Sequence, residues 1–180
     1  MADADRAGDI IDRIRDHIKK APPRKEQFDL NEAINEVIVL GRSAIIKNGV
    51  SVQTRLSEGL SPIHCDRVQL QQVIVNLVLN GMHAIASVDD GLRDLLIRAN
   101  QNEAGQVIVA VTDSGIGIDP DHLDHLFEAF FTTKRDGMGM GLSVCRSIVE
   151  AHGGEMWVAP NDGPGATFHF TIQTHDEAPT

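Results

Sequence analysis

Hydrophobic positions along the chain follow two periods, one of three to four residues and one of two. The longer period predicts helices over residues 3–20, 30–47, 67–87 and 141–152. Alternating or continuous apolar runs predict strands near 50–56, 92–100, 106–112, 155–159 and 165–173. Helices interleaved with adjacent strand pairs favour an α+β fold, a two-layer α/β sandwich with a mixed, mostly antiparallel sheet and its helices on one face.

Local sequence sets several helix boundaries. Asp29 followed by Glu32, and Asp66 followed by Gln69, are capping boxes that begin the second and third helices. Pro120 suits the first turn of a short helix that we expect to end near residue 126, followed by a loop over about 128–138.

The first predicted helix is separated from the rest of the chain by a Pro-Pro segment over residues 21–25. Its isoleucines form one apolar stripe, which predicts a partner helix: Ile10, Ile11, Ile14 and Ile18. We therefore expect an arm with its linker over 1–25, a main domain over 26–175 and a tail over 176–180.

Composition narrows the class of partner. The chain has 180 residues and a formal net charge of −10, so we expect no nucleic-acid binding. No apolar run approaches the ~18 residues of a membrane span, so we expect no membrane contact from this chain. Cys65 and Cys145 lie far apart and are interpreted as reduced thiols, which indicates a cytoplasmic location. A longer protein that contains this chain can still carry a membrane anchor.

Glycines at every second position, Gly137, Gly139 and Gly141, lead into the fourth predicted helix. Glycine lets a backbone approach a ligand closely, and a helix start offers free N–H groups to a phosphate. The spacing matches neither the P-loop nor the Rossmann pattern. A flexible loop before a helix is the alternative interpretation.

Polar side chains lie on one face of the helix predicted over 67–87, among them Asn76, Asn80 and His83. An Asn oxygen can fill one Mg²⁺ position while phosphates fill others. A solvated helix face is the alternative. Asp113 ends a buried strand before a glycine turn, and its carboxylate could accept a hydrogen bond from an adenine amino group. The alternative there is an ordinary turn.

The segment from Leu126 to Lys134 holds half of the six phenylalanines. We expect Phe127 and Phe130 to anchor this loop in the core. Lys134 could reach a phosphate as a point charge, and the alternative is an ordinary surface lysine.

In this order, the four segments resemble the catalytic, ATP-binding domain of sensor histidine kinases, whose fold is shared with gyrase B, Hsp90 and MutL. Residues 66–87 resemble its N box, 113–119 its G1 box, 126–134 its F box and 137–142 its G2 box. The segments 29–32, 150–154 and 165–168 are also similar, so the resemblance covers about residues 28–173.

The resemblance implies a role for each motif residue. Asn80 would bind Mg²⁺, and Asn76 and Asn80 would be the catalytic positions. Asn76 stands where gyrase-type ATPases carry a catalytic Glu; an Asn cannot deprotonate water, which favours a kinase. The nucleotide-binding positions that it implies are Asn80, His83, Asp113, Gly115, Gly117, Ile118, Lys134, Gly137, Gly139, Gly141, Leu142 and Thr167.

Three positions depart from the family pattern. His83 replaces a common phosphate-contacting Lys or Arg, Gly81 a common Ala, and Met140 the usual Leu. On helix propensity alone, Gly81 weakens its helix by ~1 kcal/mol. The resemblance makes residues 132–138 an ATP lid, which we expect to be disordered without nucleotide and ordered with it.

The resemblance implies an ATP–Mg²⁺-dependent protein-histidine kinase domain. It would donate the γ-phosphate to a histidine on a dimerisation hairpin, for onward transfer to a response regulator, within a homodimeric longer protein. Residues 3–20 resemble only the end of the second hairpin helix, so His17 is not the acceptor. The alternatives are a non-catalytic nucleotide-sensing module, an ATP hydrolase and a serine kinase of the anti-sigma type.

Overall fold

The protein is described by a computed structural model that covers residues 24–134, 137 and 139–174. The arm helix predicted over 3–20, the tail over 176–180 and three lid residues lie outside these described residues. The predicted ordering of the lid on nucleotide binding therefore stays a prediction.

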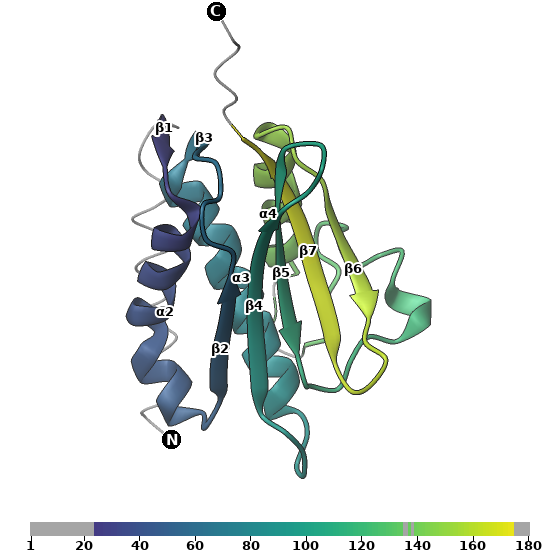
Figure 1. The fold of residues 1–180 in the computed structure, drawn as a ribbon. Helices are drawn as coiled ribbons and strands as arrows, with labels where there is room; N and C mark the ends of the chain where they lie inside the picture. Colours follow the sequence, from purple (N-terminus) through teal and green to yellow (C-terminus); the bar gives the residue numbers. More distant parts are fainter. Residues whose placement is uncertain (1–23, 135–136, 138, 175–180) are drawn as a thin grey trace, which may run out of the picture.

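The fold class predicted from the sequence is confirmed: helices pack on a mixed, mostly antiparallel sheet. Its elements are β1 (Lys25–Phe28), α2 (Leu30–Lys47), β2 (Ser51–Leu56), β3 (Ile63–Asp66), α3 (Arg67–Ala86), β4 (Asp94–Gln101), β5 (Gln106–Asp113), the 3₁₀ turn η1 (Pro120–His122), α4 (Gly141–Ala151), β6 (Met156–Pro160) and β7 (Ala166–Gln173). The larger sheet has the order β2-β4-β5-β7-β6, and only the β2–β4 pair is parallel. Figure 1 shows α3 and α4 behind this sheet and α2 beside β2.

Two short strands escaped the sequence prediction. β1 and β3 have four residues each and pair antiparallel as a separate sheet. Four residues are too few for an alternating pattern to stand out, and their pairing joins segments far apart in the chain. The short helix expected up to residue 126 is also wrong in extent. The 3₁₀ turn ends at His122, and turns with i to i−3 hydrogen bonds continue from there to Glu128.

Apolar side chains from α3 and the sheet form the core between the two layers. Its largest fully buried members include Ile74, Leu77, Leu95, Ile97 and Phe170. Burying each such side chain contributes about 1.5–3 kcal/mol, so this layer contact supplies much of the fold's stability.

Asp66 is the junction at which α3, β1 and α4 meet. Its Oδ1 accepts from the N–H of Gln69 at 2.9 Å and its Oδ2 from the N–H of Arg24 at 2.7 Å. Its own N–H donates to Nε2 of His152 at 3.1 Å, while Nδ1 of His152 lies 2.7 Å from the carbonyl of Ile148. An Nε2 that accepts leaves the proton on Nδ1, so the imidazole is neutral and joins the end of α4 to the start of α3.

Gly81 marks the closest approach of α3 to the sheet. A Cβ at this position would lie 2.5 Å from Cδ1 of Leu95 and 3.3 Å from Cβ of Asp113. Leu95 is fully buried and cannot easily give way. The glycine that propensity alone marks as a weakness is therefore what lets the helix reach the end of β5.

We expect Gly81→Ala to lower the free energy of unfolding, by about 1–2 kcal/mol, because overpacking outweighs the gain in helix propensity. Gly41→Ala in α2 is the matched control. Its added Cβ meets only Cδ1 of Ile45, at an ordinary 3.6 Å, so it should raise stability by up to ~1 kcal/mol. Urea denaturation of both variants measures the difference, and equal stabilisation by the two would contradict the close contact.

Candidate functional site

Asn80, His83 and Lys134 meet at the surface of α3. The two α3 residues are three apart and share a helix face, and Lys134 reaches them from the loop after η1. Nζ of Lys134 donates to Oδ1 of Asn80 at 3.1 Å and lies 3.1 Å from Nδ1 of His83. An ammonium only donates, so Nδ1 of His83 is the acceptor and its ring proton is on Nε2.

The electrostatics of this cluster change the role expected for His83. Burial, and secondly the charge of Lys134, lower the pKa of His83 below its ordinary value. Partial burial of its ammonium likewise lowers the pKa of Lys134. His83 is thus a neutral acceptor that holds Lys134, rather than a second cation beside a phosphate. The amide oxygen of Asn80 already faces a positive charge, and an oxygen of this kind suits a hard cation.

Asp113 ends β5 with its carboxylate buried beside α3. Its Oδ1 accepts from the N–H of Gly115 at 2.9 Å, and the N–H of Ala166 also donates to the carboxylate. Burial raises the pKa of Asp113 above its ordinary value, although these two hydrogen bonds oppose the rise. The group is therefore a fixed, poorly hydrated acceptor.

The turn after Asp113 lies directly on α3. A Cβ on Gly115 would sit 2.4 Å from the carbonyl carbon of Ala84, so only glycine fits there. Gly117 has φ +75°, and a Cβ on it would lie 3.3 Å from the carbonyl oxygen of Gly165. Ile118 packs partly against the core. The predicted G1 residues are thus brought together around Asp113 by backbone contacts.

The three glycines before α4 have three different surroundings. Gly139 has φ +67°, and a Cβ there would lie 2.4 Å from the carbonyl carbon of Phe130. A glycine at this position therefore allows the close backbone contact within the loop. A Cβ on Gly137 would meet Oγ1 of Thr132 at 2.6 Å. Gly141 faces open space.

The glycines lead directly into the start of α4. Its N-cap, Met140, makes no side-chain capping hydrogen bond. The first N–H groups of a helix lack intrahelical partners and favour an anion. Leu142, in the first turn, packs partly against the core and holds this end in place. The glycines therefore lead to a helix start that is suited to a phosphate.

The side chain of Asn76, on α3, contacts α4. It is buried, and its Nδ2 donates to Sγ of Cys145 at 3.4 Å. This contact gives Asn76 a structural role, and its predicted catalytic role stays a prediction.

Thr167 is not brought to Asp113. It pairs with Thr112 across β5 and β7, and their hydroxyl oxygens lie 2.9 Å apart. Neighbouring side chains of a strand point to opposite faces, so Thr167 faces away from the carboxylate of Asp113. The predicted nucleotide contact of its side chain therefore lacks support; the backbone of Ala166 takes that place. The hydroxyl of Thr167 donates instead to Asn161, a residue that the sequence prediction missed.

Of the two phenylalanines predicted to anchor the loop, Phe127 and Phe130, only the first does so. Phe127 is confirmed as an anchor, since its ring packs edge-on to Phe168 and under the guanidinium of Arg146. Phe130 is 74% exposed, so its predicted burial is wrong. It has φ +68° and its N–H donates to the carbonyl of Gly139, a backbone geometry that turns the ring outward.

Comparison with known proteins identifies the relatives of this fold and site. The model of the histidine kinase-, DNA gyrase B- and HSP90-like ATPase family matches residues 65–176. The chain is 41% identical over 172 residues to the sensor protein FixL of Bradyrhizobium diazoefficiens, which covers 96% of this chain. The chain spans 34% of the length of FixL.

Solved structures of histidine kinases are similar in fold as well. Full-length ShkA in complex with AMPPNP aligns with a TM-score of 0.73 at 28% identity, over 84% of this chain and 31% of that one. Histidine kinase ThkA in complex with the response regulator protein TrrA aligns with a TM-score of 0.71 at 30% identity, over 94% of this chain and 47% of that one. Among the described residues, none of the helices combines the length and the apolar character needed to cross a membrane.

If Asp113 accepts from an adenine amino group, the preference for ATP over ITP should depend on its ionisation. Inosine carries a carbonyl where adenine carries the amino group, and both nucleotides carry the same phosphates. We expect the affinity ratio to fall, by about tenfold or more, as pH drops through the raised pKa of Asp113. The fall should therefore begin at a higher pH than an ordinary aspartate would give.

Calorimetry with both nucleotides between pH 8 and pH 4.5 measures the ratio, and Asp113→Asn should make the ratio independent of pH. A ratio in the parent chain that does not change with pH would contradict the assignment.

Proposed function

The chain belongs to the family of histidine kinase-, DNA gyrase B- and HSP90-like ATPases, and we propose that it is the ATP–Mg²⁺-binding catalytic domain of a two-component sensor histidine kinase. In this role it donates the γ-phosphate of ATP to a histidine on a dimerisation helix. The phosphate then passes to a response regulator. Because the chain spans only part of FixL, the activity of the whole protein belongs to this proposal.

The contact between Asn80 and Lys134 is the observation that carries this proposal. It joins the N box on α3 to the F box loop across 54 positions of sequence, at 3.1 Å. At Gly81, the next residue of α3, an added Cβ would lie 3.3 Å from Cβ of Asp113, so this turn of the helix lies close to Asp113. One stretch of helix thus borders both an acceptor suited to a base and a cation suited to phosphates. Phosphoryl transfer needs mainly positioning and charge neutralisation, and these groups supply both.

The residues fit a magnesium ion. Oδ1 of Asn80 is a neutral oxygen at the surface, turned toward a positive charge. Mg²⁺ prefers oxygen and takes few protein ligands when phosphates supply others. Asn80 would hold the ion, which when bound neutralises negative charge on the phosphate oxygens. Lys134 would bind a phosphate as a point charge.

The partners follow from the proposed reaction. A dimerisation hairpin with the acceptor histidine belongs to the longer protein, which we infer to be a homodimer. ThkA has been captured with the response regulator TrrA, which supports a response regulator as the second acceptor. The described cysteines, Cys65 and Cys145, are buried thiols that are not joined in a disulfide, in keeping with a cytoplasmic location.

Asn76 argues against ATP hydrolysis as the main activity. The position corresponds to the catalytic Glu of gyrase-type ATPases, and an amide cannot take a proton from water. Its donation to Cys145 also engages the side chain in packing between helices. Transfer to a protein histidine needs no such base on this domain, because the imidazole is itself the nucleophile.

The test supplies the acceptor as a separate chain. The 180-residue protein is incubated with radiolabelled ATP, Mg²⁺ and the dimerisation hairpin of FixL, and label on the hairpin is measured. We expect acid-labile label, as for phosphohistidine. Asn80→Ala should lower the rate by about 100-fold and Lys134→Ala by about tenfold, since each removes a group that stabilises charge.

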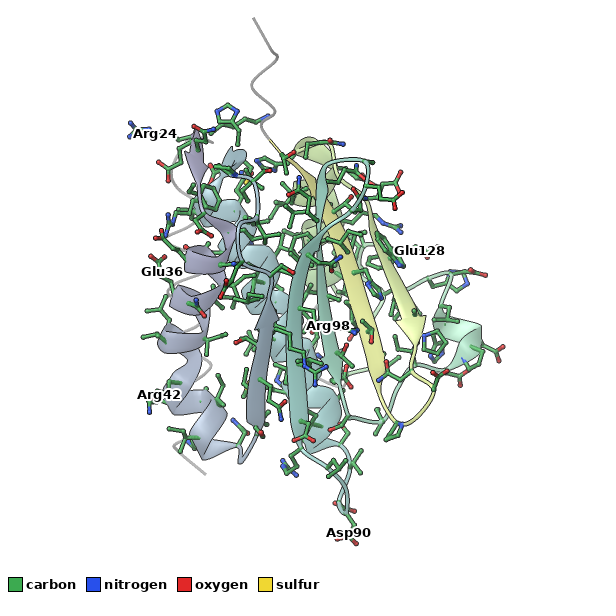
Figure 2. The ribbon with its side chains drawn as sticks, viewed as in Figure 1. Arg24, Glu36, Arg42, Asp90, Arg98 and Glu128 are labelled. Atoms are coloured by element: carbon green, nitrogen blue, oxygen red, sulfur yellow. The ribbon has the colours of Figure 1, made fainter. Side chains whose placement is uncertain are left out.

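Arg42→Ala is the matched control for lost positive charge, because Arg42 points away from the molecule on α2 (Figure 2). It should leave the rate unchanged. Steady phosphate release without the hairpin would indicate a hydrolase instead. Tight ATP binding with no label on the hairpin would favour a nucleotide-sensing module.

A further inference from the structure

The turn between β6 and β7, residues 161–165, lies against the backbone of Asp113. Nδ2 of Asn161 donates to the carbonyl of Asp113 at 3.0 Å and to the carbonyl of Pro164 at 3.0 Å. One side-chain amide therefore ties the end of β5 to the far side of the turn. Both of these acceptors are carbonyl oxygens, so the NH₂ group must face them, which sets the orientation of the amide.

The oxygen of the same amide is also engaged. Oγ1 of Thr167 donates to Oδ1 of Asn161 at 2.7 Å. A hydroxyl has one proton, so the 2.9 Å contact between Thr167 and Thr112 has Thr112 as its donor. The chain of hydrogen bonds runs from Thr112 through Thr167 and Asn161 to the carbonyl of Asp113. It lies on the sheet face opposite the carboxylate of Asp113.

The turn and the carboxylate are too close to move independently. A Cβ on Gly165 would lie 1.8 Å from the carbonyl oxygen of Asp113 and 2.9 Å from its Oδ1. The next residue, Ala166, donates its N–H to the carboxylate. A shift of the turn would therefore lengthen one of the two hydrogen bonds that orient Asp113. The side chain of Asn161 opposes this shift, because its amide donates to the carbonyl of Asp113 on β5 and to the carbonyl of Pro164 in the turn.

We propose that Asn161 is a positioning residue for recognition of the nucleotide base, acting through Asp113 and the Gly165–Ala166 backbone without touching the nucleotide. The proposal rests on the proposed function, in which Asp113 accepts from the adenine amino group. It explains why a polar side chain in a surface turn has its amide donors and its acceptor satisfied within the fold. It also assigns Thr167 a supporting place in the same network.

The test compares base recognition with phosphate binding. Affinities for ATP and ITP are measured by calorimetry for the parent chain, Asn161→Ala and Asn161→Asp. We expect Asn161→Ala to weaken ATP binding by roughly tenfold and ITP binding by less than about twofold. Asn161→Asp keeps the acceptor for Thr167 but turns an oxygen toward two carbonyls, so it should lose at least as much preference for ATP.

Two further variants calibrate the result. Asp162→Ala lies in the same turn at an exposed position, and it should change neither affinity. Thr167→Val removes the bond to the Asn161 oxygen and the acceptor for Thr112 but keeps both amide donors of Asn161 paired, so it should lower the ATP/ITP ratio by about two- to threefold. If Asn161→Ala does not fold, this milder variant decides the question through the same ratio.

The outcomes separate the inference from the function on which it rests. Equal weakening of ATP and ITP in Asn161→Ala would show a merely structural role and overturn the inference. An unchanged ATP/ITP ratio, with Asp113→Asn abolishing the preference, would overturn it while the proposed function stands. A parent chain that binds ATP and ITP equally would overturn the adenine assignment of Asp113, and the inference with it.

Discussion

The close contact of α3 with the ends of β4 and β5 is the constraint on which the candidate site depends. Gly81 lies where α3 meets the sheet, and Gly115 lies where the turn after β5 meets α3. A side chain at either position would collide with the facing residues. The helix therefore lies close to Asp113, and Asn80, the residue before Gly81, is near enough to belong to the same candidate site.

The position of α4 depends on two polar contacts, one at its C-terminal end and one within the helix. At one end, the neutral imidazole of His152 bridges the backbone of Ile148 and the backbone of Asp66. Further along, the buried amide of Asn76 donates to Cys145. Buried polar groups of this kind cost free energy unless they are paired, so they favour one alignment of the two helices over others. That alignment fixes where the start of α4 lies relative to α3; the N-cap residue at this start, Met140, makes no side-chain capping hydrogen bond.

Sequence periodicity and capping residues predicted the long elements because each depends on neighbours along the chain. The 30–47 helix and its Asp29 cap were predicted at their observed bounds. Features that depend on pairing could not be predicted in this way. The four-residue strands β1 and β3, and the face on which Thr167 lies, follow from registers between distant segments. The exposure of Phe130 follows from a positive φ at a non-glycine residue, for which the apolar pattern gives no signal.

The two ends of the candidate site, at Asp113 and at Lys134, are formed by different kinds of group, and this difference has a physical consequence. Asp113 is buried and oriented by backbone N–H groups, so the end at which we propose that the base binds is formed by the fold itself. The opposite end consists of side chains near the surface, where the two partners of Lys134 among the described residues are both neutral. In a chain with a net charge of −10, a cation held by two neutral groups is a local attraction for phosphate. Under the proposed function, the rigid acceptor Asp113 would set which nucleotide binds, whereas the charged end, formed by side chains, would follow the phosphates as their charge changes.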